Sequence, residues 1–80
     1  MKSVTIYSTP TCHFCHMTKD YLKEHGVAYT EFDVAKDLQK RQEMIQKSGQ
    51  MGVPVIIIGD ELIVGFDKER IAGALGIAAA

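Results

Sequence analysis

Apolar residues alternate with polar ones, then recur at helical spacing, then alternate again in the first half of the chain. Residues 4–7 are β-branched and aromatic, which is typical of a strand. From Phe14 the apolar residues, Tyr21 among them, fall on one face at helical spacing, and Gly26 is a natural end for that helix. Residues 27–33 alternate once more and predict a second strand.

The middle of the chain is more polar. Residues 38–47 are charged and rich in glutamine, and they predict a largely exposed helix. Leu38, Met44 and Ile45 are its expected apolar contacts. Asp37 is a candidate N-cap, because its side chain can accept hydrogen bonds from the first backbone N–H groups of a helix.

The most apolar run is residues 55–58, which are all β-branched and fit a strand buried on both faces. A tight turn at residues 59–60 leads into residues 61–64, so these two runs predict a hairpin. Asp67 can cap a last helix that continues through about Leu75, and we expect the residues at the end of the chain to fray.

The resulting order of elements is β-α-β-α-β-β-α. The first βαβ unit must be parallel and right-handed, and the closing hairpin must be antiparallel. The fold class is therefore α/β, with a four-stranded mixed sheet flanked by three helices. No repeat or linker divides the chain, so residues 1–80 form a single domain.

Composition and charge narrow the classes of function. Hydrophobic residues make up 46% of the chain, which is typical of a globular protein. The net charge of −1, with both signs interspersed, favours neither a nucleic-acid partner nor a membrane surface. The first residues are too short and too alternating for a signal peptide, and no apolar run reaches the roughly 20 residues of a membrane helix. We therefore expect a cytoplasmic protein.

The chemistry centres on the only two cysteines, Cys12 and Cys15. A bridge between them would close a very small loop, and loop entropy is the main source of stabilisation by a disulfide. The pair is therefore better explained as reactive than as structural or as two buried apolar thiols. Three interpretations fit the spacing: a redox dithiol, a metal site, or, because His16 completes a C-x-x-C-H motif, a haem attachment site.

The position of the cysteines favours the redox dithiol. Cys12 lies at the start of the first helix, where unpaired N–H groups and the helix dipole stabilise a thiolate. Cys15 lies one turn later, where it should be less accessible and can act as the resolving thiol. A C-x-x-C motif next to a βαβ pattern is typical of a thioredoxin-like redox site.

The other two interpretations meet physical obstacles. Haem attachment requires an export route and a helical shell around the haem, and the predicted strands do not provide one. Cys12, His13, Cys15 and His16 offer donors for Zn²⁺, yet four ligands on five consecutive residues cannot converge on one ion. A metal or iron–sulfur cluster shared by two subunits, each giving Cys12, remains the alternative.

Three motifs in order give the chain a resemblance to the glutaredoxins. They are Tyr7-Ser8-Thr9-Pro10-Thr11-Cys12-x-x-Cys15, Gly52-Val53-Pro54 and Gly65-Phe66-Asp67. The resemblance implies a thioredoxin-like fold and a thiol–disulfide oxidoreductase with a nucleophilic Cys12, a resolving Cys15 and a cis-Pro54. It also implies a groove for glutathione or another substrate, which would be formed by Thr11, His13, Phe14, Val53, Pro54 and Asp67.

Several positions depart from the family pattern. Thr9 stands where a basic residue is often found, Gly52 replaces threonine, Val64 replaces glycine, and His13-Phe14 replaces proline-tyrosine. Each change touches the groove that would hold glutathione. Similar small redoxins depart in the same region, accept electrons from thioredoxin reductase and donate them to ribonucleotide reductase.

The implied partners follow from this resemblance. They are a client protein that contains a disulfide and, as the electron source, either glutathione as co-substrate or a flavoprotein disulfide reductase. We expect a monomer with no tightly bound cofactor.

Some side chains near the motif have two interpretations. His13 and His16 are expected to face solvent, where either could also tune Cys12. Phe14 is either a contact for a partner or part of the core. Asp67 is a helix cap that could also contact a ligand.

Overall fold

The computed structural model describes residues 3–77, so the fraying expected at the end of the chain concerns residues 78–80, which lie outside the described part. The elements in this part are β1 (Val4–Ser8), α1 (His13–Glu24), β2 (Thr30–Asp33), α2 (Leu38–Ser48), β3 (Val55–Ile58), β4 (Glu61–Val64) and α3 (Lys68–Leu75). Their order is the one predicted from the sequence.

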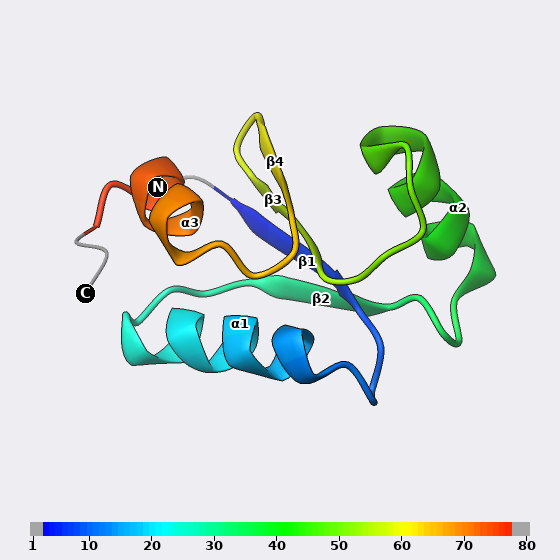
Figure 1. The fold of residues 1–80 in the computed structure, drawn as a ribbon, viewed down its shortest axis with the longest axis horizontal. Coiled ribbons are helices and arrows are strands. Elements are labelled where there is room, and N and C mark those ends of the chain that lie inside the picture. Colours follow the sequence, from blue (N-terminus) through cyan, green and yellow to red (C-terminus); the bar gives the residue numbers. More distant parts are fainter. Residues whose placement is uncertain (1–2, 78–80) are drawn as a thin grey trace.

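The four strands form one mixed sheet in the order β2-β1-β3-β4 (Figure 1). β1 pairs in parallel with β2 and antiparallel with β3, and β3 pairs antiparallel with β4. Figure 1 shows β1 and β3 crossing the middle of the molecule, with the helices around them. This arrangement confirms the predicted α/β fold of the thioredoxin-like type.

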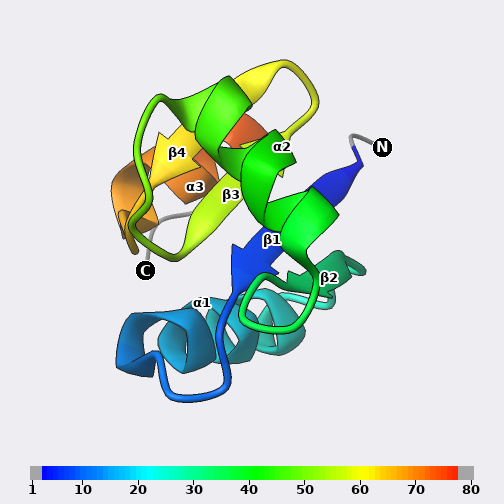
Figure 2. The ribbon, with the colours of Figure 1, turned by 90° about the vertical axis from the view of Figure 1, so that its right-hand side faces the viewer.

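The sheet is covered on both faces, as Figure 2 shows with α2 on the side away from α1 and α3. On one face, α1 and α3 pack through Leu22 and Ile71 against Ile56 and Ile58 of β3. On the other face, Met44 of α2 packs against residues that include Tyr7 and Val55. Because successive side chains of a strand point to opposite faces, β3 contributes to both cores, which confirms its expected two-sided burial.

Two boundaries and one contact differ from the sequence-based prediction. The second strand begins at Thr30 rather than at residue 27, because Val27 N–H still donates to Leu22 C=O (2.9 Å) and closes the end of α1. The first strand extends to Ser8, which pairs with Asp33. Leu38, an expected apolar contact of the second helix, is 64% exposed because it lies at the first residue of α2, before the helix reaches the sheet.

The predicted helix caps are confirmed. Asp37 accepts a hydrogen bond from Lys40 N–H (3.1 Å), and Asp67 accepts one from Arg70 N–H (3.2 Å). Gly49 ends α2 in the left-handed conformation at a φ of 73°, which a side chain would disfavour. Among residues 3–77, none of the helices has the length and apolar character that crossing a membrane requires.

A buried tyrosine ties α2 to the central strand. The Tyr7 hydroxyl donates to Glu43 Oε2 (2.6 Å), and Lys40 Nζ pairs with the same oxygen at 3.3 Å. Burial, followed by the hydrogen bond to Glu43, raises the pKa of Tyr7 to about 12. The same hydrogen bond, aided by Lys40, lowers the pKa of Glu43. Tyr21, by contrast, has a buried hydroxyl without a hydrogen-bond partner in the described structure.

These two tyrosines give a matched test of the packing. We expect Tyr7→Phe to lower the free energy of unfolding by about 1–2 kcal/mol, because it removes a hydrogen bond to a charged group. Tyr21→Phe should leave stability unchanged or raise it, because it removes a buried hydroxyl that has no partner. Urea denaturation followed by circular dichroism measures both. Equal destabilisation by the two substitutions would contradict the assigned hydrogen bond.

Candidate active site

The turn after β1 places Cys12 at the first turn of α1. Cys12 N–H donates to Thr9 C=O (3.3 Å), which closes the turn, and His16 N–H donates to Cys12 C=O (3.2 Å), which begins the helix. Cys12 is the N-cap residue, and its Sγ accepts a hydrogen bond from Cys15 N–H at 3.2 Å. The sulfur therefore occupies the position of a capping oxygen, where the helix dipole favours negative charge.

The two thiols have different environments. Cys12 is half-buried, whereas Cys15 is fully buried one helical turn later. Burial is the main cause that raises the pKa of the Cys15 thiol to about 12, and its hydrogen bond to Cys12 adds to the effect. The backbone N–H of Thr9 and the charge of Lys19 act in the opposite direction. The pair thus consists of one accessible sulfur and one protected thiol that is hard to ionise while Cys12 is reduced.

The loop before β3 reaches the same end of the sheet as the dithiol. Tyr7 lies opposite Val55 in the antiparallel pairing of β1 with β3, so Val53 and Pro54 sit beside the chain that leaves β1 for Cys12. The Val53–Pro54 peptide bond is cis, as the sequence resemblance implied. Pro54 C=O accepts a hydrogen bond from Gly65 N–H (2.8 Å), which aligns the end of β4 with this loop.

A glutamine side chain braces this loop. Gln50 Oε1 accepts from Gly52 N–H (2.5 Å), and Gln50 Nε2 donates to Gly52 C=O (3.0 Å). Ser48 Oγ also takes a hydrogen bond from Gln50 Nε2 (3.3 Å). A Cβ atom at position 52 would lie 2.6 Å from Gln50 Oε1. The Gln50 amide thus occupies the space that a side chain at position 52 would enter.

Three large apolar side chains are exposed near this end of the molecule. Phe14 is 54% exposed, Met51 is 60% exposed and Val64 is 46% exposed. Phe14 stands on the first turn of α1, Met51 in the braced loop and Val64 at the end of β4 beside Gly65. The exposure of Phe14 decides against the core interpretation. Met51 was not predicted as a site residue. Its position in the loop just before Val53 and Pro54, which were predicted, could have indicated that it lies near the site.

The remaining predicted residues lie on the surface around the motif. Thr11 and His13 are exposed, and the His13 ring lies against Phe14 with 5.7 Å between ring centroids. His16 is exposed as expected, and its Nε2 lies 2.9 Å from Pro10 C=O. Asp67 caps α3 just after Gly65 and Phe66. The structure thus brings the predicted residues to the loops at one end of the sheet.

A partly exposed charged network that the sequence did not reveal lies near Cys15. Lys19 Nζ pairs with Glu31 Oε2 at 2.9 Å, and the Lys19 side chain is only 19% exposed. The buried Ser8 hydroxyl donates to the same carboxylate oxygen at 2.6 Å. These contacts lower the pKa of Glu31, the Ser8 hydrogen bond most, and the bond to Glu31 raises the pKa of Lys19. The four-residue spacing between Cys15 and Lys19, which makes them neighbours on the helix, was the only sign of this arrangement in the sequence.

The described structure does not assemble a metal site within one chain. Residues 3–77 contain no group of three or more His, Cys, Asp or Glu side chains placed to hold a metal ion.

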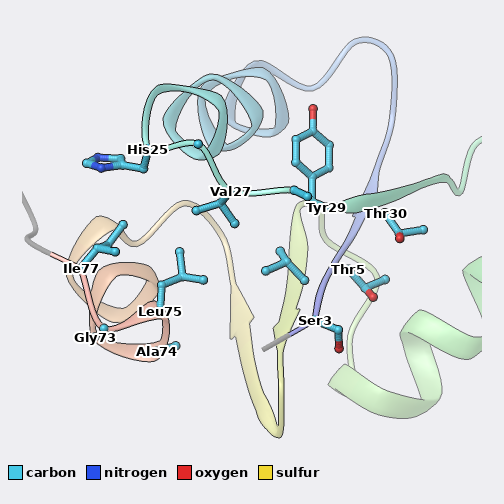
Figure 3. Close-up of a pocket in the computed structure, with 14 residues that line it drawn as sticks. Ser3, Thr5, His25, Val27, Tyr29, Thr30, Gly73, Ala74, Leu75 and Ile77 are labelled. Carbon is cyan, nitrogen blue, oxygen red and sulfur yellow. The ribbon is translucent and has the colours of Figure 1, made fainter. Parts of the chain in front are cut away.

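A cavity of about 770 Å³ lies at the other end of the sheet (Figure 3). It opens between the end of α1, the segment that leads to β2 and the end of α3. In Figure 3 the side chains of Val27, Leu75 and Ile77 point toward one another across it. The cavity borders the beginning of β1, whereas Cys12 follows the end of β1. The cavity is therefore separate from the dithiol.

Comparison with known proteins identifies the family. The glutaredoxin family model matches residues 4–63. The chain is 48% identical over 68 residues to an uncharacterised glutaredoxin-like 8.6 kDa protein in the rubredoxin operon of Clostridium pasteurianum, covering 85% of this chain and 91% of that one. It is 40% identical over 67 residues to glutaredoxin 3 of Escherichia coli K12, covering 84% and 81%. The chain belongs to the glutaredoxin family and is a thiol–disulfide oxidoreductase.

Solved structures agree with this assignment. The fold superposes with a TM-score of 0.90 on a mutant of the thioredoxin-like protein BC3987, at 35% identity and with coverage of 98% of this chain and 100% of that one. It matches the glutaredoxin-like NrdH-redoxin of Escherichia coli with a TM-score of 0.79 at 28% identity, covering 89% and 92%. That protein is described as having a thioredoxin-like activity profile.

The unequal exposure of the two thiols predicts their reactivity toward alkylation. We expect iodoacetamide to modify the reduced native protein once, at Cys12, because Cys15 is fully buried and is protonated at neutral pH. Denatured protein should take up two adducts. Peptide mass spectrometry locates the adducts, and equal labelling of both cysteines in the native protein would overturn the assigned asymmetry.

Proposed function

We propose that this protein reduces disulfides of client proteins, with Cys12 as the attacking thiol and Cys15 as the resolving thiol. The observation that carries the proposal is the contrast between the two sulfurs. Cys12 Sγ is partly exposed at the N-terminus of α1, and Cys15 is fully buried one turn later. Only Cys12 is accessible to an incoming disulfide, and the helix N-terminus favours the thiolate that attacks.

The reaction proceeds in two exchanges. The Cys12 thiolate attacks one sulfur of the client disulfide, and the other client sulfur leaves with the electron pair and takes up a proton. Cys15 then loses its proton to solvent and attacks Cys12 Sγ. The bond between Cys12 and the client breaks, and the second client thiol is released. The client has gained two electrons, and the protein is left with a Cys12–Cys15 disulfide.

A protein client suits the surroundings of the dithiol. Phe14, Met51 and Val64 expose apolar surface at the end of the sheet that carries Cys12. A contiguous apolar patch is typical of a protein contact surface, and we propose that these three side chains contribute to one. Glutathione is a small and charged peptide, so it has less apolar surface with which to contact these three side chains.

The electron source that fits this surface is a flavoprotein disulfide reductase rather than glutathione. Thr9 carries no charge, so it lacks the charge-assisted hydrogen bond that a cation gives to a carboxylate. Val64 adds a half-exposed side chain beside Gly65, where backbone alone would leave room for a ligand. The choice depends on Thr9 and Val64, because the chain is similar both to glutaredoxin 3 (40% identity) and to NrdH-redoxin (28% identity).

Substitution of each cysteine tests the assigned order of events. We expect Cys12→Ser to abolish reduction of a protein disulfide, because no other accessible thiol is available. Cys15→Ser should accumulate a mixed disulfide between Cys12 and the client, because the resolving attack is lost. Non-reducing electrophoresis and intact mass spectrometry detect the trapped complex. Full turnover by the Cys12→Ser protein would refute the mechanism.

Coupled assays separate the two electron sources. We expect NADPH oxidation to be fast with thioredoxin reductase and slow with glutathione plus glutathione reductase. Thr9→Lys is the matched variant, because it restores the missing cation and should raise the glutathione-linked rate severalfold without changing the reductase-linked rate. A wild-type protein that turns over only with glutathione would contradict the assigned electron source, while leaving the roles of Cys12 and Cys15 intact.

A further inference from the structure

The second exchange of the proposed mechanism has an electrostatic difficulty. Cys15 must become a thiolate in order to attack Cys12, yet it is fully buried. Burial in a medium of low dielectric constant disfavours the charged form of a thiol. A group that offsets this cost must carry positive charge or donate a hydrogen bond to the Cys15 sulfur.

Formation of the mixed disulfide removes part of this difficulty. The hydrogen bond and charge of Cys12 raise the pKa of Cys15 in the reduced protein. Both are lost once Cys12 is bonded to the client, because its sulfur is then neutral. The influences that remain are burial, the Thr9 backbone N–H and Lys19. Lys19 is the positively charged side chain among them. Its share in lowering the pKa of Cys15 is therefore larger in the mixed disulfide than in the reduced protein.

The structure places Lys19 on the same face of α1 as Cys15. Positions four residues apart on a helix are neighbours, with Cβ atoms about 5–6 Å apart, so Lys19 and Cys15 share one face of α1. Lys19 interacts electrostatically with Cys15, and its side chain is only 19% exposed. Glu31 on β2 fixes the ammonium group at 2.9 Å, and the Ser8 hydroxyl at the end of β1 fixes Glu31 in turn.

We propose that Lys19, anchored by Glu31 and Ser8, is a positioning residue for the second exchange, in which it favours the Cys15 thiolate within the mixed disulfide. This inference rests on the proposed roles of Cys12 and Cys15. The first exchange does not require Lys19, because the Cys12 sulfur obtains its stabilisation from the helix N-terminus.

The other charged groups around this face act through Glu31 and Lys19. His16 contributes to the lowered pKa of Glu31, and Tyr29 contributes to the raised pKa of Lys19. Both shifts keep the Lys19–Glu31 pair charged across the neutral range. The Lys19–Glu31 pair therefore does not itself add a titration to the second exchange in the neutral range.

A two-phase reaction tests the inference. Stopped-flow mixing of the reduced protein with a chromogenic aromatic disulfide should release one thiol when Cys12 attacks and a second when Cys15 attacks. The first phase depends on reagent concentration, and the second does not. Lys19→Met should slow the second phase about three- to tenfold at neutral pH, because a higher thiol pKa reduces the thiolate fraction more than it raises nucleophilicity. The pH profile of that phase should move to higher pH.

Three further variants isolate the charge. Lys19→Gln keeps an N–H donor for Glu31 but removes the positive charge, so it should be as slow as Lys19→Met. Lys19→Arg should restore the second phase. Lys23→Met removes an exposed lysine one turn further along α1 and should change neither phase. Circular dichroism checks that each variant is folded.

The outcomes are distinguishable. Lys19→Gln at the wild-type rate, or a slowed second phase whose pH profile does not move, would overturn the electrostatic role of Lys19. Equal slowing of both phases would overturn it as well. A second phase that persists in Cys15→Ser would instead refute the resolving role of Cys15, and with it the proposed function.

Discussion

The pairing of β1 with β3 is the constraint on which the rest of the molecule depends. β3 is buried on both faces, and its antiparallel register with β1 sets Tyr7 opposite Val55. This single register brings the turn that leads to Cys12 next to the loop that contains Pro54. A shift of β3 by one residue would send each of its side chains to the opposite face and would move the Pro54 loop along the turn that leads to Cys12.

The same arrangement creates the difference between the two thiols. The turn after β1 ends at Cys12, which is the N-cap residue of α1. Three residues later the helix has already turned inward, so Cys15 is covered by the protein. One short motif therefore contains a sulfur at the positive end of a helix dipole and a second sulfur in a medium of low dielectric constant. Disulfide exchange uses both sulfurs, because the exposed one attacks the client disulfide first and the buried one reacts only in the second step.

The surroundings of the dithiol combine a rigid loop with an apolar rim. Gln50 holds the loop through hydrogen bonds to both backbone groups of Gly52, which leaves its neighbour Met51 exposed. The glycine at position 52 and the glutamine at position 50 are thus parts of one local structure.

The sequence by itself determined the element order, the helix caps at Asp37 and Asp67, the hairpin and the C-x-x-C chemistry, because these depend on neighbouring residues and on local periodicity. Only the tertiary structure decided that Phe14 is exposed, that the second strand begins at Thr30, and that Lys19 meets Glu31. The physical reason is the same for Phe14 and Lys19. Helical periodicity shows which residues share a face, but the strand that packs against the face decides which of them are buried and which charges are paired.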